Sequence, residues 1–153
     1  MTSTSEQAKE QAIKNFKSGM NCAQAVSTVF AERFGIKKEM LQMISQPFGG
    51  GMCRMREVCG CVSGMLLALG LYKGSDEDSK EKKDEIYEIG QKLAKEFEDI
   101  NGSIICAELL GTKKGSPVSE ARTKEYYKKR SCGDMVAFTA QLLENYLIKQ
   151  GKL

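Results

Sequence analysis

The sequence predicts an all-α protein, a helical bundle of about six to seven helices around a central apolar helix. Straight-chain residues such as Lys, Glu, Ala, Leu and Met dominate the composition, and these side chains lose little rotamer freedom in a helix. Only two prolines occur, and no long run is rich in Val, Ile and Thr, the residues typical of strands. The 153 residues, 41% apolar and 28% charged, match one globular domain, so we expect residues 1–153 to fold as a single domain.

The N-terminal part of the chain predicts three helices. Residues 5–17 place apolar side chains on one face, namely Ala8, Ala12, Ile13 and Phe16. Asn21 is a suitable N-cap for a second helix over residues 22–34, which Gly35 would end. A short helix over residues 37–44 should follow.

A glycine-rich loop comes next, over residues 46–53 with the sequence Gln-Pro-Phe-Gly-Gly-Gly-Met-Cys. It is not a phosphate-binding loop, because no Gly-Lys-Ser/Thr follows it and no apolar strand precedes it. Two interpretations remain open. The segment is either a flexible or tightly turned connector, or one whose backbone approaches a functional site closely.

Residues 57–72 predict the central helix, because apolar side chains surround it on nearly all sides. Gly60, Gly64 and Ala68 recur every four residues and form a groove of small residues along this helix. Glycine within a helix costs about 1 kcal/mol relative to alanine. The groove should therefore admit a close neighbour, either another helix or a bound group, and we note Gly60 and Gly64 as candidate cofactor-binding positions.

Ser75 should open a long amphipathic helix that Asn101-Gly102 ends. Residues 76–85 alternate acidic and basic side chains, which indicates a solvated helix face with intrahelical ion pairs. A short helical turn should follow over residues 106–110, with Gly111 after it.

The C-terminal part predicts two more helices. Ser116-Pro117 places proline at the first position of one of them, and Lys128-Lys129-Arg130 suits its C-terminal end. Ser131 and Asp134 form a Ser-x-x-Asp capping arrangement for the last helix.

Composition excludes several functions. The net charge of +3 is mild, and no basic patch is interleaved with aromatic residues, so we expect no nucleic-acid partner. Histidine is absent, which excludes a catalytic Cys-His or Ser-His-Asp relay and any metal site that needs histidine. No apolar run is long enough to span a membrane, so no membrane insertion is expected. Because no secretory signal is visible, we expect a cytoplasmic protein with reduced thiols.

The six cysteines are the main candidates for functional residues, because their thiols can react or bind metals. Four of them fall at predicted helix starts, namely Cys22, Cys59, Cys106 and Cys132. The free N–H groups and positive potential of a helix N-terminus stabilise a thiolate, so we expect these thiols to have lowered pKa values. Buried thiols that serve only as small hydrophobic groups are the alternative.

We expect Cys53 and Cys61 to have a secondary role in the candidate site. Two residues apart on a helix, Cys59 and Cys61 would point to nearly opposite faces, so they should not bind one ion together unless the helix is broken at Gly60. Cys53, in the glycine-rich loop, could reach either of them as a resolving thiol.

These segments resemble the C_GCAxxG_C_C family, small proteins with four characteristic cysteines. Asn21-Cys22-Ala23-Gln24-Ala25-Val26 is similar to the first cysteine segment of the family, and Gly49-Gly50-Gly51 with Glu57-Val58-Cys59-Gly60-Cys61-Val62-Ser63-Gly64 is similar to its central CGAxxG signature. Cys106 and Cys132 correspond to the last two cysteines. Cys61 stands where the family pattern has alanine, and Cys53 is additional. The resemblance implies a redox role.

Three functions remain open. In the first, the four helix-start cysteines exchange thiols with disulfides, as in a thiol–disulfide oxidoreductase. In the second, Cys22, Cys59, Cys106 and Cys132 bind metal, either zinc or an iron–sulfur cluster. In the third, the chain is a helical interaction module. The redox partner is unknown, and a homodimer is left open.

Overall fold

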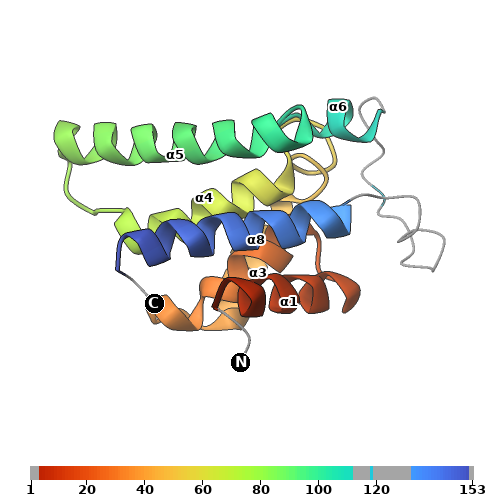
Figure 1. Ribbon diagram of the computed structural model, residues 1–153, viewed down its shortest axis with the longest axis horizontal. Helices are drawn as coiled ribbons and strands as arrows, with labels where there is room; N and C mark the ends of the chain where they lie inside the picture. Colours follow the sequence, from red (N-terminus) through yellow and green to blue (C-terminus); the bar gives the residue numbers. More distant parts are fainter. Residues whose placement is uncertain (1–3, 112–117, 119–131, 152–153) are drawn as a thin grey trace.

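The computed structural model describes residues 4–111, 118 and 132–151 of the chain. Within these residues every regular element is a helix, apart from one isolated antiparallel bridge between Val58 and Ile105. This confirms the prediction of an all-α bundle (Figure 1). The α-helices are α1 (Thr4–Lys17), α2 (Cys22–Ser27), α3 (Lys38–Ser45), α4 (Gly60–Lys73), α5 (Lys80–Asn101), α6 (Cys106–Leu110) and α8 (Cys132–Lys149). The short 3-10 helices are η1 (Thr28–Phe30), η2 (Glu32–Phe34) and η3 (Gln46–Phe48).

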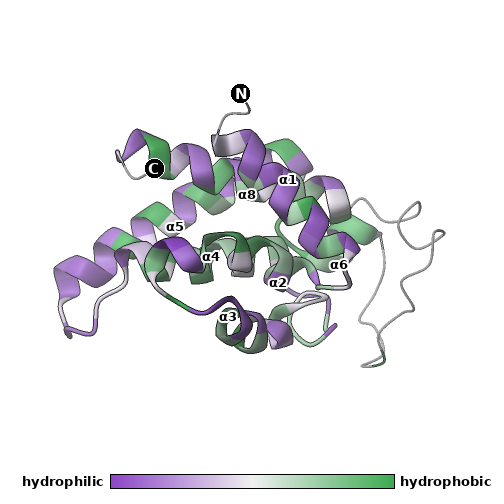
Figure 2. Ribbon diagram, turned by 90° about the horizontal axis from the view of Figure 1, so that it is seen from below, coloured by the Kyte–Doolittle hydropathy of each residue, from purple (hydrophilic) through white to green (hydrophobic). Residues whose placement is uncertain are grey.

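Helix α4 is the central apolar helix that the sequence predicts. It contacts α2, α5 and α8, while α1 packs against α8 and α2. Figure 2 shows α4 coloured as hydrophobic along most of its length, between α1 and α8 on one side and α2 and α3 on the other. Its Met65 and Leu69 are buried in one core cluster with Phe97 of α5 and Leu143 of α8. Burial of these side chains holds the helices together, because removing apolar surface from water is the main favourable contribution to folding.

The predicted helix over residues 22–34 is interrupted in the structure. The segment divides into α2, η1 and η2, although Gly35 ends it in a left-handed conformation, with φ of 75°, as expected. At the break, polar side chains form hydrogen bonds with backbone carbonyls of the segment. Asn15 donates to the carbonyl of Ala25, and the Thr28 hydroxyl donates to the carbonyl of Gln24. Such side-chain bonds weaken the regular helical pattern.

The central helix begins later than predicted, at Gly60 rather than at residue 57. The preceding residues are extended and pair with the segment before α6. The N–H of Cys59 donates to the carbonyl of Ile104 at 2.7 Å, and the N–H of Cys106 donates to the carbonyl of Glu57 at 2.6 Å. These cross-chain bonds outweigh the local preference for helix.

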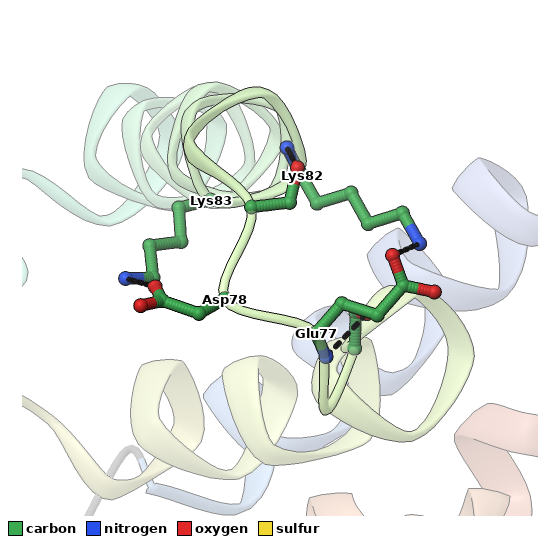
Figure 3. A network of polar contacts seen from close by, with 6 residues as sticks. Glu77, Asp78, Lys82 and Lys83 are labelled. Carbon is green, nitrogen blue, oxygen red and sulfur yellow. Dashed lines mark hydrogen bonds and ion pairs between the residues drawn. The ribbon is translucent and has the colours of Figure 1, made fainter.

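Helix α5 also begins later than predicted, at Lys80 instead of near Ser75. Ser79 acts as the N-cap, because its hydroxyl accepts from the N–H of Lys82. The charged run is solvated as predicted. Exposed ion pairs join Glu77 to Lys82 and Asp78 to Lys83 across the first turn (Figure 3).

Two other helices end at the glycines from which the sequence predicts their ends. Gly102 and Gly111 end α5 and α6 in left-handed conformations, with φ of 95° and 64°. The predicted helix start at Ser116-Pro117, the basic run at 128–130 and the Ser131 cap lie outside the described residues. Among the helices of the described part, none has the length and hydrophobicity needed to cross a membrane.

Candidate functional site

The structure places four cysteines at helix starts, as the sequence predicts. One is the residue that caps α4, and three are the first residues of their helices. They are Cys59, the N-cap of α4, and Cys22, Cys106 and Cys132, which begin α2, α6 and α8. Cys22 is half-buried and the other three are buried. The four thiols come from separate segments of the chain but lie in one region of the bundle. Cys106 and Cys132 each interact electrostatically with Cys22 and Cys59.

Helix α2 reaches this region because two glycines of α4 leave room for its backbone. A Cβ atom on Gly64 would lie 2.6 Å from the carbonyl oxygen of Ala23, and one on Gly60 would lie 3.1 Å from the Cβ of Cys22. Asn21 fixes the start of α2 through a capping box with Gln24. The predicted groove is thus filled by another helix, one of its two expected occupants, and this contact sets the position of Cys22.

The thiols contact one another in pairs. Cys61 lies within hydrogen-bonding contact of Cys22 and Cys59, and Cys132 lies within hydrogen-bonding contact of Cys22. We call this set the thiol row; in order of contact it runs Cys132, Cys22, Cys61, Cys59. Cys22 is therefore the member that contacts both Cys61 and Cys132.

The expectation of lowered thiol pKa values is wrong for two of the helix-start cysteines. Hydrogen bonding with Cys22, together with burial, raises the pKa of Cys132 far above its ordinary value. Burial raises the pKa of Cys106, against a smaller lowering by Arg56. Neighbouring thiols and loss of water disfavour an additional negative charge more strongly than a helix N-terminus favours it.

Cys61 belongs to the thiol row, which the sequence interpretation missed. The argument that Cys59 and Cys61 point to opposite faces requires both to lie in the helix. Cys59 instead precedes the helix, with φ of −53° and ψ of 133°. The thiol of Cys61 is fully buried, and hydrogen bonding with Cys22 and Cys59 raises its pKa well above the ordinary value.

Cys53 is exposed, in contrast to the thiol row. It lies in a turn where residues 50 to 54 all have positive φ, between 51° and 72°. For residues other than glycine this left-handed conformation costs roughly 1–2 kcal/mol each. The backbone of this turn approaches the site closely, because a Cβ on Gly51 would lie 2.6 Å from the Cβ of Cys106. The glycine-rich loop is therefore tightly turned, and its backbone also approaches Cys106 closely.

Arg56 is a site residue that sequence reasoning did not single out. Its side chain is buried, and its Nη1 donates to the sulfur of Cys106 at 3.6 Å. The available signal was a basic residue three positions before Cys59, in a segment already marked by its glycines. Without the pairing of residues 57–59 with 104–106, nothing in the sequence joins Arg56 to Cys106.

In the described part of the chain, the side chains that bind metals form no candidate metal centre. Within the residues that the structure describes, no three cysteine, aspartate or glutamate side chains are grouped so that they could hold a metal ion. The contacts of the thiol row are pairwise, whereas a zinc or iron–sulfur site needs three or four sulfurs converging on one point. Pairwise contact is the arrangement that disulfide formation requires.

The raised pKa values predict a stability that falls in alkali. In reduced protein, Cys61 and Cys132 keep their protons above the ordinary thiol pKa of 9.0. In the unfolded chain the same thiols ionise near that value, so the folded state binds more protons there. The free energy of unfolding should then drop between about pH 8.5 and pH 10, by up to ~1.4 kcal/mol per pH unit for each thiol.

Urea unfolding followed by circular dichroism in a reducing buffer measures this drop. Cys61→Ala should make the pH dependence shallower, whereas Cys53→Ala, at an exposed position, should leave it as it is. An equal slope in wild type and Cys61→Ala would show that Cys61 does not stay protonated in the folded protein.

Comparison with known proteins places the chain in a family. The family model described as "Putative redox-active protein (C_GCAxxG_C_C)" matches residues 20–146, a range that contains all six cysteines. Comparisons with curated proteins and with solved structures found no match. The family match covers most of the chain and confirms the resemblance seen in the sequence. The chain belongs to the C_GCAxxG_C_C family.

Proposed function

We propose that the thiol row carries out thiol–disulfide exchange and that Cys22 is the thiol that meets the disulfide of a redox partner. One observation carries this proposal. Cys22 is half-buried, whereas Cys59, Cys61 and Cys132 are buried, and Cys22 contacts both Cys61 and Cys132. A thiol that a partner can reach, with a second thiol in contact behind it, is the arrangement that exchange requires.

The reaction has two steps. In the first, the Cys22 thiolate attacks one sulfur of a partner disulfide, forms a mixed disulfide and releases the other partner sulfur as a thiolate. In the second, Cys61 or Cys132 loses its proton and attacks the sulfur of Cys22. The internal disulfide forms and the remaining partner thiolate leaves. Two protein thiols are oxidised, one partner disulfide is reduced, and the two protons end on the partner thiols.

The raised pKa values of Cys61 and Cys132 suit the second role rather than the first. A thiol that stays protonated at neutral pH is a poor nucleophile toward free disulfides. Once Cys22 is in a mixed disulfide, the effective concentration of a thiol in contact with it is high, which compensates for a small thiolate fraction. We place this chemistry in the cytoplasm, where reduced thiols persist.

The proposal predicts a clear difference between two serine variants. Reduced wild-type protein should consume a chromogenic aromatic disulfide and form an internal disulfide with it. Internal disulfide formation should be slower by about tenfold or more in Cys22→Ser, because the remaining thiols of the row are buried. Cys53→Ser is the matched control, since Cys53 is exposed but outside the row, and internal disulfide formation should persist in it.

Two results would contradict exchange through Cys22. One is internal disulfide formation at the wild-type rate in Cys22→Ser. The other is a wild-type reaction that stops at a stable mixed disulfide on Cys22. Metal analysis and a visible spectrum of anaerobically purified protein belong to the same experiment, because bound zinc or iron with a cluster absorption would assign the thiols to metal binding instead.

A further inference from the structure

Arg56 and Cys106 form a buried pair beside the thiol row. Arg56 is only 8% exposed, and its Nη1 is 3.6 Å from the Cys106 sulfur. The Nε of Arg56 is buried without a hydrogen-bond partner. In the part of the chain that the structure describes, no carboxylate forms an ion pair with this guanidinium. Cys106 is therefore its one side-chain partner there.

Backbone contacts hold both members of the pair in place. The N–H of Arg56 donates to the carbonyl of Gly50, and the carbonyl of Arg56 accepts from the N–H of Ala107. Gly51 packs against Cys106 so closely that a Cβ atom would not fit between them. The guanidinium is thus fixed against the sulfur by the glycine-rich turn and is not a freely moving surface cation.

The first N–H groups of α6 are not free to stabilise a thiolate at Cys106. Helix α6 is a single turn, and its first two N–H groups are occupied by the carbonyls of Glu57 and Arg56. The positive charge next to the sulfur is the guanidinium. Arginine does not lose its proton in proteins, and a buried cation without a counter-charge is costly. Ionisation of Cys106 supplies that counter-charge.

Other groups around Cys106 disfavour its ionisation. Burial raises the pKa of Cys106, and so do Cys59 and Cys22, while Arg56 lowers it. Cys132 at the start of α8 also interacts electrostatically with Cys106. On α6 itself, the Glu108 carboxylate accepts from the Ser103 hydroxyl. Among the described residues, the groups that shift the pKa values of Cys61 and Cys132 include no cation, and each of them raises the pKa.

We propose that Arg56 is a positioning residue that makes Cys106 ionise at a lower pH than the buried thiols Cys61 and Cys132. The inference goes beyond disulfide exchange through Cys22 and does not depend on it. A thiolate, unlike a thiol, reacts with small electrophiles. Of Cys61, Cys106 and Cys132, Cys106 should therefore be the first to be modified as the pH rises.

The test is the pH profile of alkylation by iodoacetamide, read cysteine by cysteine with peptide mass spectrometry on reduced protein. Alkylation forms a sulfur–carbon bond and releases iodide, so it reports the thiolate. The midpoint of the profile reports ionisation, whereas its plateau reports access, and the midpoints are compared. In the wild type, Cys106 should have a midpoint at least about one pH unit below those of Cys61 and Cys132.

Variants at Arg56 separate its charge from its packing. Arg56→Gln should raise the Cys106 midpoint by about one pH unit or more, and Arg56→Lys should retain most of the wild-type value. Arg54→Gln removes a charge from the same turn, two residues away, and should leave the midpoint as in the wild type. An unchanged Cys106 midpoint in Arg56→Gln, or Cys61 or Cys132 reacting at lower pH than Cys106, would overturn the proposal.

A second measurement applies if Arg56→Gln does not fold. The thiolate absorbance that develops as the pH is raised, below the pH at which Cys61 and Cys132 ionise, should be smaller in Cys106→Ser than in the wild type, and Cys61→Ala should leave it unchanged. An equal absorbance in Cys106→Ser and the wild type would overturn the proposal. Failure of disulfide exchange with this pH profile intact would count against the proposed function alone.

Discussion

Arg33→Met is expected to lower the free energy of unfolding by about 3–5 kcal/mol. Arg33 of η2 forms two hydrogen bonds of 2.6 Å to the carboxylate of Glu144 in α8. The Glu144 side chain is 1% exposed, whereas that of Arg33 is 27% exposed. Removal of Arg33 leaves a buried carboxylate without its partner, which is the costly way to break such a pair. Urea unfolding of reduced protein measures the change.

The reverse replacement should cost less. In Glu144→Leu, Arg33 can turn toward water, because its side chain is already partly exposed. The double variant Arg33→Met with Glu144→Leu should recover much of the stability lost in Arg33→Met, since no buried charge is left. If the two single variants lose equal stability, or if the double variant loses the sum of both, the asymmetry argued here is wrong.

Gly64→Ala is expected to destabilise the protein by about 1–3 kcal/mol, although alanine is the better helix former. The new Cβ would lie 2.6 Å from the carbonyl oxygen of Ala23 and 3.0 Å from its Cα. These are backbone atoms, so α2 as a whole must move away from α4. Because α2 begins with Cys22, the displacement should also weaken the contact between Cys22 and Cys61 and slow internal disulfide formation.

Gly70→Ala in the same helix is the matched control. A Cβ there meets no atom within 4 Å, so only the helix preference of alanine acts, and the variant should gain up to ~1 kcal/mol. The difference between the two variants isolates the contact between α2 and α4. Equal stability of Gly64→Ala and Gly70→Ala would show that close approach at Gly64 does not hold α2 in place.

The sequence predicts the helix starts of the site well because local signals determine them. Asn21 with Gln24 makes a capping box within four residues, and Gly111 ends α6 through its own backbone conformation. The groove at Gly60 and Gly64 is also visible in the sequence, since small residues four apart share one helix face. Apolar residues on all sides identify α4 as the central helix for the same local reason.

Contacts between residues that are far apart in the sequence were not predicted. Residues 57–59 read as the first turn of an apolar helix, yet they pair with residues 104–106 and become extended. This single difference moves Cys59 out of the helix, brings Cys61 into contact with it and places Arg56 beside Cys106. The pKa directions were also missed, because burial and neighbouring thiols are properties of the folded site.

In the proposed chemistry, cysteines that the sequence presents as equivalent have separate roles. Cys22 faces the partner, while Cys61 and Cys132 stand in contact behind it. Cys106 is paired with Arg56 and should ionise before Cys61 and Cys132, and Cys53 stays outside the cluster. Close packing of α2 on α4 and the bridge between residues 58 and 105 are the two structural features that create this division.

The disulfide map of the protein after oxidation with a limiting amount of diamide tests the central claim most directly. Peptide mass spectrometry would identify each bonded pair. The account predicts an intramolecular disulfide that joins Cys22 to Cys61 or to Cys132, with Cys53 left free in the monomer. Disulfides that form only through Cys53 or only between molecules, with the thiol row still reduced, would contradict it.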